Sequence, residues 1–275
     1  MSEILTRLKP TDVQLIPTTL TKYEKELINK TGCTLLELAE NAAQRPASIK
    51  TVCRKTKAAV VPISSGLGVI EGFSQAVAAI LNHIGIKTMI TREDVEGVAE
   101  AYEHGVDVIL VANDTKFVAI NLHTRRVVDN AASTAKAYVA ALDKMANGLE
   151  GREVLVIGVG SVGSTAVIDL IRRKARPLVV DIDKPKLRAF VERYRHQVVP
   201  FSRLDEAIRH TNLIINAAPA RNILKVDMIN ENTFISAPAI PIGLTPAALK
   251  KVNRNLVHDP LQLGVATMAV DACAN

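Results

Sequence analysis

The sequence predicts an α/β protein with two α/β domains, in which N-terminal helices cap the first domain and the second is built on a doubly wound parallel sheet. Two observations support this fold class. Short apolar segments alternate with helical segments along most of the chain, which is typical of parallel sheets. In addition, a glycine-rich turn at residues 158–163 follows one apolar strand and opens a helix. A chain of 275 residues is long enough to form two cores.

Residues 1–56 are expected to be helical. Tyr23–Asn29 and Leu35–Arg45 carry apolar residues at helical spacing, and Thr31-Gly32 forms a break between them. The segment contains no residue pattern with a chemistry of its own. We therefore interpret it as a cap on the first domain or as a lid over a cleft.

The first α/β region begins at about residue 58. Its loop Ser64–Gly68 and its turn Asn113-Asp114 each follow a predicted strand. Ligands of parallel sheets bind outside the carboxyl ends of the strands, so we expect this loop and this turn to converge on one crevice. The expected strands are Ala58–Ile63, Thr88–Thr91, Val106–Ala112 and Lys116–Leu122, the last as a hairpin partner, and the expected helices are Phe73–His83 and Glu93–His104.

A long alanine-rich helix, Asn130–Ala146, is expected to connect the two domains, and it ends at Asn147-Gly148. We therefore place the N-terminal helices and the catalytic domain at residues 1–148 and a Rossmann-type domain at residues 149–275. The expected strands of the second domain are Val154–Ile157, Pro177–Val180, Gln197–Val199, Asn212–Asn216, Thr233–Ser236 and Asn255–Val257.

The turn after Val154–Ile157 has the spacing G-x-G-x-x-G of a dinucleotide-binding fingerprint. Its glycines permit a tight turn, close approach of a pyrophosphate and close packing of helix on strand, and the helix N-terminus faces the phosphates. Asp181 ends the next strand at about the spacing of 20 residues expected for a ribose-binding acid, which favours NAD. Lys184, Lys186 and Arg188 are interpreted as a solvated helix face. The expected cofactor-binding residues are Gly158, Val159, Gly160, Ser161, Val162, Gly163 and Asp181, with Ala218, Pro219, Ala237 and Pro238 at two later strand ends.

Composition excludes several other classes of protein. The chain is 48% hydrophobic and 23% charged, and no apolar run reaches the roughly 18 residues of a membrane span. The first ten residues lack a signal-peptide core, so we expect a cytoplasmic protein. The net charge of +6 is scattered and only five Phe, four Tyr and no Trp are present, which argues against nucleic acid as a partner. Three cysteines without a C-x-x-C motif indicate neither a disulfide framework nor a metal site.

Four blocks of the sequence resemble the dehydrogenase family that completes pyrrolysine biosynthesis. They are V-P-I-S-S-G-L-G-V-I-E-G-F-S-Q (Val61–Gln75), I-L-V-A-N-D-T-K-F-V-A-I-N-L (Ile109–Leu122), S-A-P-A-I-P (Ser236–Pro241) and D-P-L-Q-L-G-V-A-T-M (Asp259–Met268). The resemblance runs from about Val61 to Met268 and is looser in the N-terminal helices.

The resemblance implies an NAD-dependent oxidation of 3-methyl-D-ornithyl-N6-L-lysine. In that reaction the primary amine carbon of the methylornithine part loses hydride to NAD, ammonia leaves, and the α-amine closes the pyrroline ring. It also implies a small catalytic domain, a Rossmann domain and an N-terminal helix that closes over the substrate. We expect a small-molecule substrate of the lysine-ornithine dipeptide type as the partner, and neither nucleic acid nor a membrane. A homodimer is one option for the oligomeric state, which the sequence leaves open.

The substrate-binding residues are placed on the matched blocks. Ser64 and Ser65 can donate to substrate oxygens or accept from its amines, and Asp114 can hold an ammonium. Ser65 and Asp114 are assigned catalytic contacts. Each residue could instead have a purely structural role. Ser64 and Ser65 could form a turn that caps the next helix, and Asp114 could initiate a hairpin turn. Many family members carry an acid where this chain has Asn113, and a Glu where it has Asp259. The full expected set is Ser64, Ser65, Phe73, Asn113, Asp114 and Asp259.

Two other functions remain open from the sequence. One is another NAD(P)-dependent amino-acid or folate-type dehydrogenase, although such enzymes usually place a Lys or a Tyr-Lys pair where this chain offers Ser, Asn and Asp. The other is a non-enzymatic NAD-binding redox sensor, which would need an interaction module that residues 1–56 do not resemble.

Overall fold

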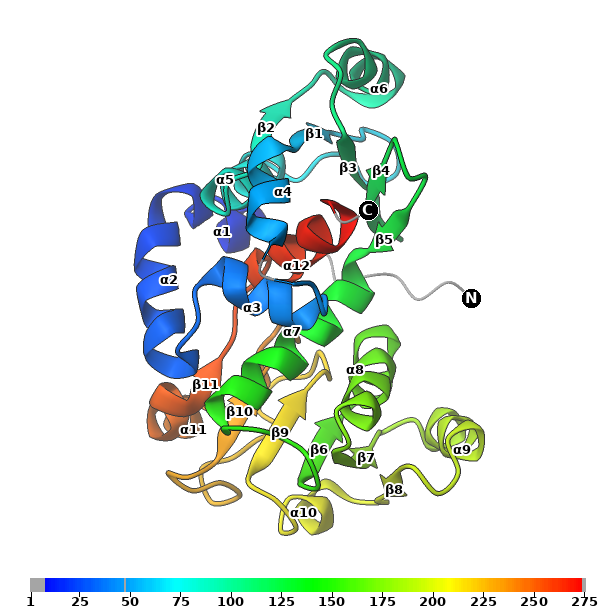
Figure 1. The fold of residues 1–275 in the computed structure, drawn as a ribbon. Coiled ribbons are helices and arrows are strands. Elements are labelled where there is room, and N and C mark those ends of the chain that lie inside the picture. The colour runs from blue at the N-terminus through cyan, green and yellow to red at the C-terminus, as the bar shows by residue number, and fades with distance from the viewer. Residues whose placement is uncertain (1–7, 47, 274–275) are drawn as a thin grey trace. The chain divides into compact units, whose positions relative to one another are not determined.

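The computed structural model describes residues 8–46 and 48–273, which form two compact units with one β-sheet each (Figure 1). The first unit holds the described residues up to Leu27, residues Cys33–Ala137, and the described residues from Pro260 onward. The second unit comprises Ile28–Gly32 and Tyr138–Asp259. The predicted α/β class with two α/β domains is confirmed.

The sheet of the first unit has the order β2-β1-β3-β4-β5, and its first three strands are parallel. Strands β4 and β5 extend it in antiparallel orientation, so the predicted hairpin gains a further strand. The strands are β1 (Lys57–Val61), β2 (Lys87–Ile90), β3 (Val108–Ala112), β4 (Phe117–Asn121) and β5 (Val127–Asp129). The helices are α1 (Pro10–Val13), α2 (Ile16–Thr31), α3 (Leu35–Ala42), α4 (Ile49–Lys55), α5 (Phe73–His83), α6 (Asp94–Glu103) and α7 (Asn130–Met145), the last of which continues into the second unit.

The C-terminal helix α12 (Gln262–Cys273) belongs to the first unit, which differs from the expected division at residues 148 and 149. All of its residues are buried, and it packs against α3, α5 and β4. Gly264 permits a close crossing of α7, because a Cβ there would overlap the Thr134 hydroxyl. The chain therefore returns to the first unit after Asp259, where its last helix, which has apolar residues on every side, is buried in the core.

The sheet of the second unit is parallel, with the order β11-β10-β9-β6-β7-β8. This is the doubly wound order of dinucleotide-binding domains, and it reverses direction between β6 and β9. The strands are β6 (Glu153–Ile157), β7 (Arg176–Val180), β8 (Val199–Pro200), β9 (Leu213–Asn216), β10 (Phe234–Ser236) and β11 (Leu256–Val257). The helices are α8 (Ser161–Arg172), α9 (Lys184–Arg193), α10 (Leu204–Ala207) and α11 (Pro246–Val252), followed by the 3-10 turn η1 (Asn253–Asn255).

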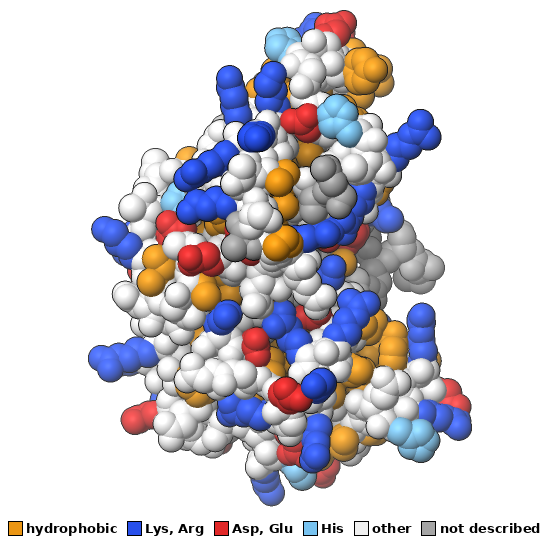
Figure 2. Space-filling view, in the orientation of Figure 1, with side chains coloured by type: hydrophobic (Ala, Val, Ile, Leu, Met, Phe, Trp, Pro, Cys, Tyr) orange, Lys and Arg blue, Asp and Glu red, His pale blue; other side chains and the backbone are white. Residues whose placement is uncertain are grey.

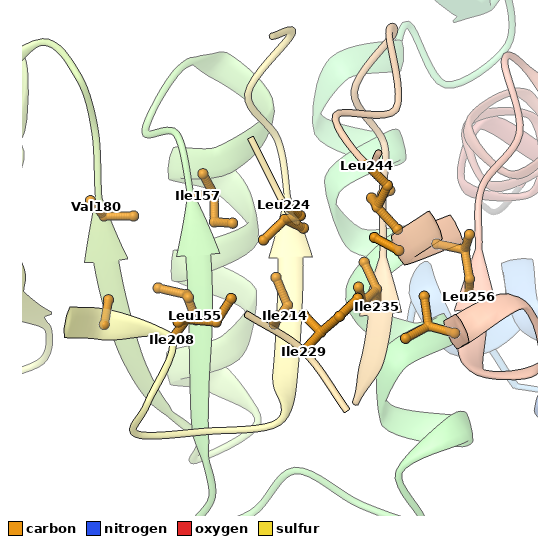
Figure 3. Close-up of a cluster of buried hydrophobic side chains, with 14 of the residues drawn as sticks. Leu155, Ile157, Val180, Ile208, Ile214, Leu224, Ile229, Ile235, Leu244 and Leu256 are labelled. Atoms are coloured by element: carbon orange, nitrogen blue, oxygen red, sulfur yellow. The ribbon is translucent and has the colours of Figure 1, made fainter. Parts of the chain in front are cut away.

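A cluster of buried aliphatic side chains supports one face of this second sheet (Figure 3). Leu155, Ile214 and Ile235 come from the neighbouring strands β6, β9 and β10. Leu224 and Leu244, joined by a short parallel bridge, add a layer from the segments outside these strands. The apolar strand pattern of the sequence is thus explained by burial against this cluster.

The turn between β6 and α8 adopts the conformation that its glycines permit. Gly158 has a φ of +90°, and a Cβ there would lie 3.2 Å from the Ala218 nitrogen. A Cβ on Gly163 would overlap the carbonyl oxygen of Gly158, so α8 approaches the turn as closely as backbone allows. A Cβ on Gly160 would meet only the Lys186 ammonium at 3.8 Å. The first and third glycines are therefore required for packing, and the second leaves space.

Two alanine substitutions should separate these roles. We expect Gly163→Ala to lower the free energy of unfolding of the second unit by about 3 kcal/mol or more, because the helix must move away from the turn. We expect Gly160→Ala to fold normally, with a loss of less than about 1 kcal/mol, but to bind NAD more weakly because its methyl group fills the pyrophosphate approach. Urea unfolding and NAD titration of both variants measure this, and equal stability of the two would contradict the assignment.

The buried carboxylate of Asp271 is expected to hold α12 in the first unit. Its side chain is 6% exposed, and its Oδ1 atom lies 2.9 Å from Nη2 of Arg45 and 2.7 Å from Nη2 of Arg126. We expect Asp271→Asn to cost about 2–4 kcal/mol in urea unfolding, because two partly buried guanidinium groups lose their counter-charge. As a matched control, Glu150→Gln removes the exposed pair with Lys174 and should cost less than about 0.5 kcal/mol. A similarly small cost for Asp271→Asn would show that apolar packing alone holds the helix.

Candidate functional site

Three connections meet at the carboxyl edge of the first sheet. The loop Ser64–Gly68 follows β1, Asp94 follows β2 at the start of α6, and the turn Asn113-Asp114 follows β3. Because β2, β1 and β3 are adjacent and parallel, their carboxyl ends lie at the same edge. The structure brings the Ser64–Gly68 loop and Asp114 into direct contact, as the sequence predicts.

Asp114 and Asn113 have different local roles. The Asp114 carboxylate accepts the N–H of Leu67 at 2.8 Å, and it occupies the space that a Cβ on Gly66 would take. The Asn113 side-chain oxygen instead accepts the N–H groups of Thr115 and Lys116, at 2.9 and 2.8 Å. Asn113, and not Asp114, therefore initiates the hairpin turn, and the carboxylate is directed to the loop.

Phe73 lies beside this edge at the first position of α5. Its ring packs edge-to-face on Phe117, the first residue of β4, with ring centroids 5.3 Å apart. The α5 N-cap is Gly72 with a φ of +81°, a conformation that glycine adopts without strain. Phe73 is therefore held by apolar packing next to the turn that carries Asp114.

Asp94 is a candidate site residue that the sequence analysis missed. Its carboxylate accepts the N–H of Ser64 at 2.9 Å through Oδ1 and the Ser64 hydroxyl through Oδ2. These hydrogen bonds, the hydroxyl first, hold the pKa of Asp94 below its usual value. The signal in the sequence was an acid that opens a helix directly after a strand, at the same sheet edge as Ser64. Ser65 itself is exposed beside this pair.

The second unit carries the dinucleotide fingerprint at the reversal point of its sheet. Asp181 follows β7, and its carboxylate accepts the Val159 N–H at 2.7 Å and the Asp183 N–H at 2.8 Å. A carboxylate has about four lone-pair sites, so these two bonds leave capacity for ribose hydroxyls. Ile182, next to it, is 96% exposed. The open approach at Gly160, the N-terminus of α8 and this acid together fit an adenosine diphosphate group.

Later strand ends of the second unit also lie at the same edge. The Ala217 N–H donates to Ile157 at 2.9 Å, which places the Ala218-Pro219 turn beside the glycine turn. The Ala237 N–H donates to Val257, so the Ala237-Pro238 turn stays at the end of β10. Their contacts with a cofactor remain a prediction.

Lys184 and Arg188 are exposed, as expected for a solvated helix face, whereas Lys186 is half-buried. Lys184 donates to the backbone oxygens of Asp181 and Ser202 at 2.9 and 2.6 Å. Lys186 extends over the glycine turn, with its ammonium 3.8 Å from the Cβ position of Gly160. Lys186 is therefore the basic side chain that lies over the second glycine of the turn, which spacing alone does not reveal.

Asp259 lies in the second unit and is 5% exposed. Its backbone N–H donates to the Tyr138 hydroxyl at 2.9 Å, and that hydroxyl donates to the Asp259 carbonyl at 2.7 Å. Burial, with the nearby Asp259 charge, raises the pKa of Tyr138 well above its usual value. Tyr138 was not found from the sequence, because a lone tyrosine in an alanine-rich helix gives no signal. The substrate contact expected of Asp259 remains a prediction.

Two of the three cysteines are buried in the first unit. Cys53 and Cys273 are buried, and a hydrogen bond with Cys273, then burial, raises the pKa of the Cys53 thiol. Within residues 8–46 and 48–273 there is no group of three or more His, Cys, Asp or Glu side chains arranged for a metal ion. Nor does the described part of the chain contain a helix long and apolar enough to cross a bilayer. On the face shown in Figure 2, basic side chains are spread among acidic ones.

Two family models match the two halves of the chain. Residues 12–128 match the pyrrolysine biosynthesis protein PylD, N-terminal domain, and residues 140–239 match shikimate / quinate 5-dehydrogenase. Among curated proteins, a pyrrolysine synthase of Methanosarcina acetivorans is 29% identical over 90% of this chain and 97% of its own length. A pyrrolysine synthase of Methanosarcina barkeri is 28% identical over 85% of this chain and 91% of its own.

Solved structures agree on the fold. Quinate dehydrogenase from Corynebacterium glutamicum, solved with NAD, has a TM-score of 0.54 at 15% identity and covers 79% of this chain and 92% of its own. The bifunctional methylenetetrahydrofolate dehydrogenase/cyclohydrolase from Campylobacter jejuni has a TM-score of 0.53 at 15% identity, over 90% of this chain and 95% of its own. With a dehydrogenase-type fold and matched sequence over most of its length, the chain resembles the pyrrolysine biosynthesis dehydrogenases, the family that its sequence predicts.

Proposed function

We propose that this protein is an NAD-dependent oxidoreductase that acts on the primary amine carbon of 3-methyl-D-ornithyl-N6-L-lysine and forms pyrrolysine. The observation that carries the proposal is the carboxylate-clamped Ser64–Gly68 loop at the carboxyl edge of the first sheet. Anionic groups around a small polar loop suit a substrate with several amines. Support also comes from relatives named pyrrolysine synthase that match nearly the whole chain.

The reaction balances without a metal. The amine carbon gives a hydride to NAD⁺ and the amine nitrogen gives up a proton, which leaves an imine. The α-amine of the ornithine part then attacks the imine carbon, ammonia departs, and the pyrroline ring is closed. NAD, when bound, supplies the hydride acceptor.

The residues at the first-sheet edge bind and orient the substrate in this proposal. Asp114 holds a substrate ammonium and lowers its mobility, and Ser65 makes a further polar contact. Phe73 forms the apolar side of the site through its packing on Phe117. Hydride can leave the carbon only when the amine on that carbon is neutral. The ammonium that the carboxylates bind must therefore release its proton before hydride transfer. Positioning is the main contribution of these residues to the rate.

The dipeptide assay tests the proposed function directly. Purified protein should reduce NAD when given the lysyl-methylornithine dipeptide or its des-methyl ornithyl analogue, with release of ammonia and formation of a cyclic imine. Absorbance of NADH and mass spectrometry of the product measure this. Protein that binds NAD but gives no NADH with either compound would contradict the proposal, and would favour a non-enzymatic NAD binder.

The cofactor preference is tested by variants of the two charged groups at the fingerprint. Asp181→Ala should weaken NAD binding about tenfold and narrow the preference over NADP, because a 2′-phosphate no longer meets a carboxylate. Lys186→Met should weaken NAD and NADP alike by a similar factor, since its ammonium lies over the pyrophosphate approach. The control on the same helix is Arg188→Met, which should bind both cofactors normally. An unchanged NAD to NADP ratio in Asp181→Ala would remove Asp181 from the ribose role.

A further inference from the structure

The hydrogen bonds of Ser64 fix the direction in which its hydroxyl donates. The Ser64 N–H and O–H both point to the carboxylate of Asp94, one to each oxygen. Asp94 is itself fixed, because its own N–H donates to the carbonyl of Pro62 at 2.9 Å. It is the first residue of α6, which follows β2, so the acid belongs to a different strand connection from the loop that it holds.

The protonation of Asp94 decides which way the Ser64 proton points. The two bonds from Ser64 hold the pKa of Asp94 below its usual value, so the carboxylate is ionised at neutral pH. An ionised carboxylate can only accept hydrogen bonds, and a serine hydroxyl has one proton and two lone pairs. The Ser64 proton is therefore committed to Asp94, and the rest of the hydroxyl can act only as an acceptor.

The charges around this pair favour a cationic donor. Arg92, two residues before Asp94, pairs with Glu96 and Glu100 at 3.3 Å each. Asp114 contacts the same loop through the Leu67 N–H. A ligand group that reaches the Ser64 hydroxyl thus meets an acceptor oxygen that is bonded to one carboxylate, on a loop that a second carboxylate contacts. A protonated amine matches this setting, whereas a carbonyl or a carboxylate would find no donor at the hydroxyl.

We propose that Asp94 is a positioning residue that fixes the Ser64 hydroxyl as an acceptor for a protonated amine in the ornithine part of the substrate. This inference rests on the proposed function. It states which partner donates and which accepts in one contact of that site. It also decides between the two roles that the sequence left open for Ser64, because donation to a substrate oxygen requires the proton that Asp94 holds.

Four variants test the inference through dipeptide binding to the NADH-loaded protein, measured by calorimetry. Asp94→Asn and Ser64→Ala should each weaken binding by about tenfold or more. The double variant should bind no more weakly than Ser64→Ala alone, because Asp94 acts through the hydroxyl. Ser64→Thr, which keeps the hydroxyl, should retain most of the affinity. If Asp94→Asn costs as much in the Ser64→Ala background as in the native chain, the acid acts through the loop backbone and the proposal is overturned.

Two analogues identify the amine. The norvalyl analogue lacks the side-chain amine of the ornithine part, and the 5-aminopentanoyl analogue lacks its α-amine. Asp94→Asn should leave binding of one of these analogues unchanged while it weakens binding of the dipeptide and of the other. An equal loss for all three ligands would contradict an amine contact at Ser64.

The matched control is Asp107→Asn. Asp107 also accepts a backbone N–H, from Lys57 at 2.7 Å, but at the amino end of β1. The Asp107→Asn variant should bind the dipeptide as the native protein does. Thermal unfolding should show that all variants are folded. A native protein that binds NADH but neither binds nor oxidises the dipeptide would disprove the proposed function. A native protein that does both, with Asp94→Asn unchanged in binding, would disprove only the role of Asp94.

Discussion

Both candidate sites depend on one constraint, namely that the carboxyl ends of parallel strands meet at the same edge of a sheet. In the first unit this brings together three connections that are far apart in sequence, and in the second it places Asp181 beside the glycine turn. Side chains at such an edge lie outside the hydrogen-bonded ladder. They are therefore available to each other and to a ligand, while the strands beneath stay buried.

Acids perform most of the local organisation at these edges. Asp94, Asp114 and Asp181 each accept backbone N–H groups of a neighbouring loop. Backbone donors at a loop must find acceptors, and a charged acceptor makes the stronger bond. The same bonds keep a negative charge close to where an amine or a ribose hydroxyl is expected. Loop conformation and ligand chemistry are thus determined by the same side chains.

Much of the fold could be predicted because it is encoded locally. The apolar strands β6 and β7, the glycine turn and the helices α2 and α3 follow from period, turn residues and spacing. Strand β5 was not predicted, since three residues with an exposed Val127 carry no periodicity. Helix α12 and its place in the first unit were also not predicted. A short segment with apolar residues on every side gives no helical stripe, and its burial depends on α3 and α5.

The sequence by itself determined the dinucleotide fingerprint, the acid at Asp181 and the family resemblance, because each is a matter of residue type at fixed spacing. Only the tertiary structure decided which polar groups are partners. It assigned the hairpin turn to Asn113, directed Asp114 to Leu67, placed Lys186 over Gly160 and joined Asp94 to Ser64. Apart from the local turn of Asn113, these pairings join residues from different strand connections. The physical reason is that sheet order, not distance along the chain, selects the neighbours of a strand end.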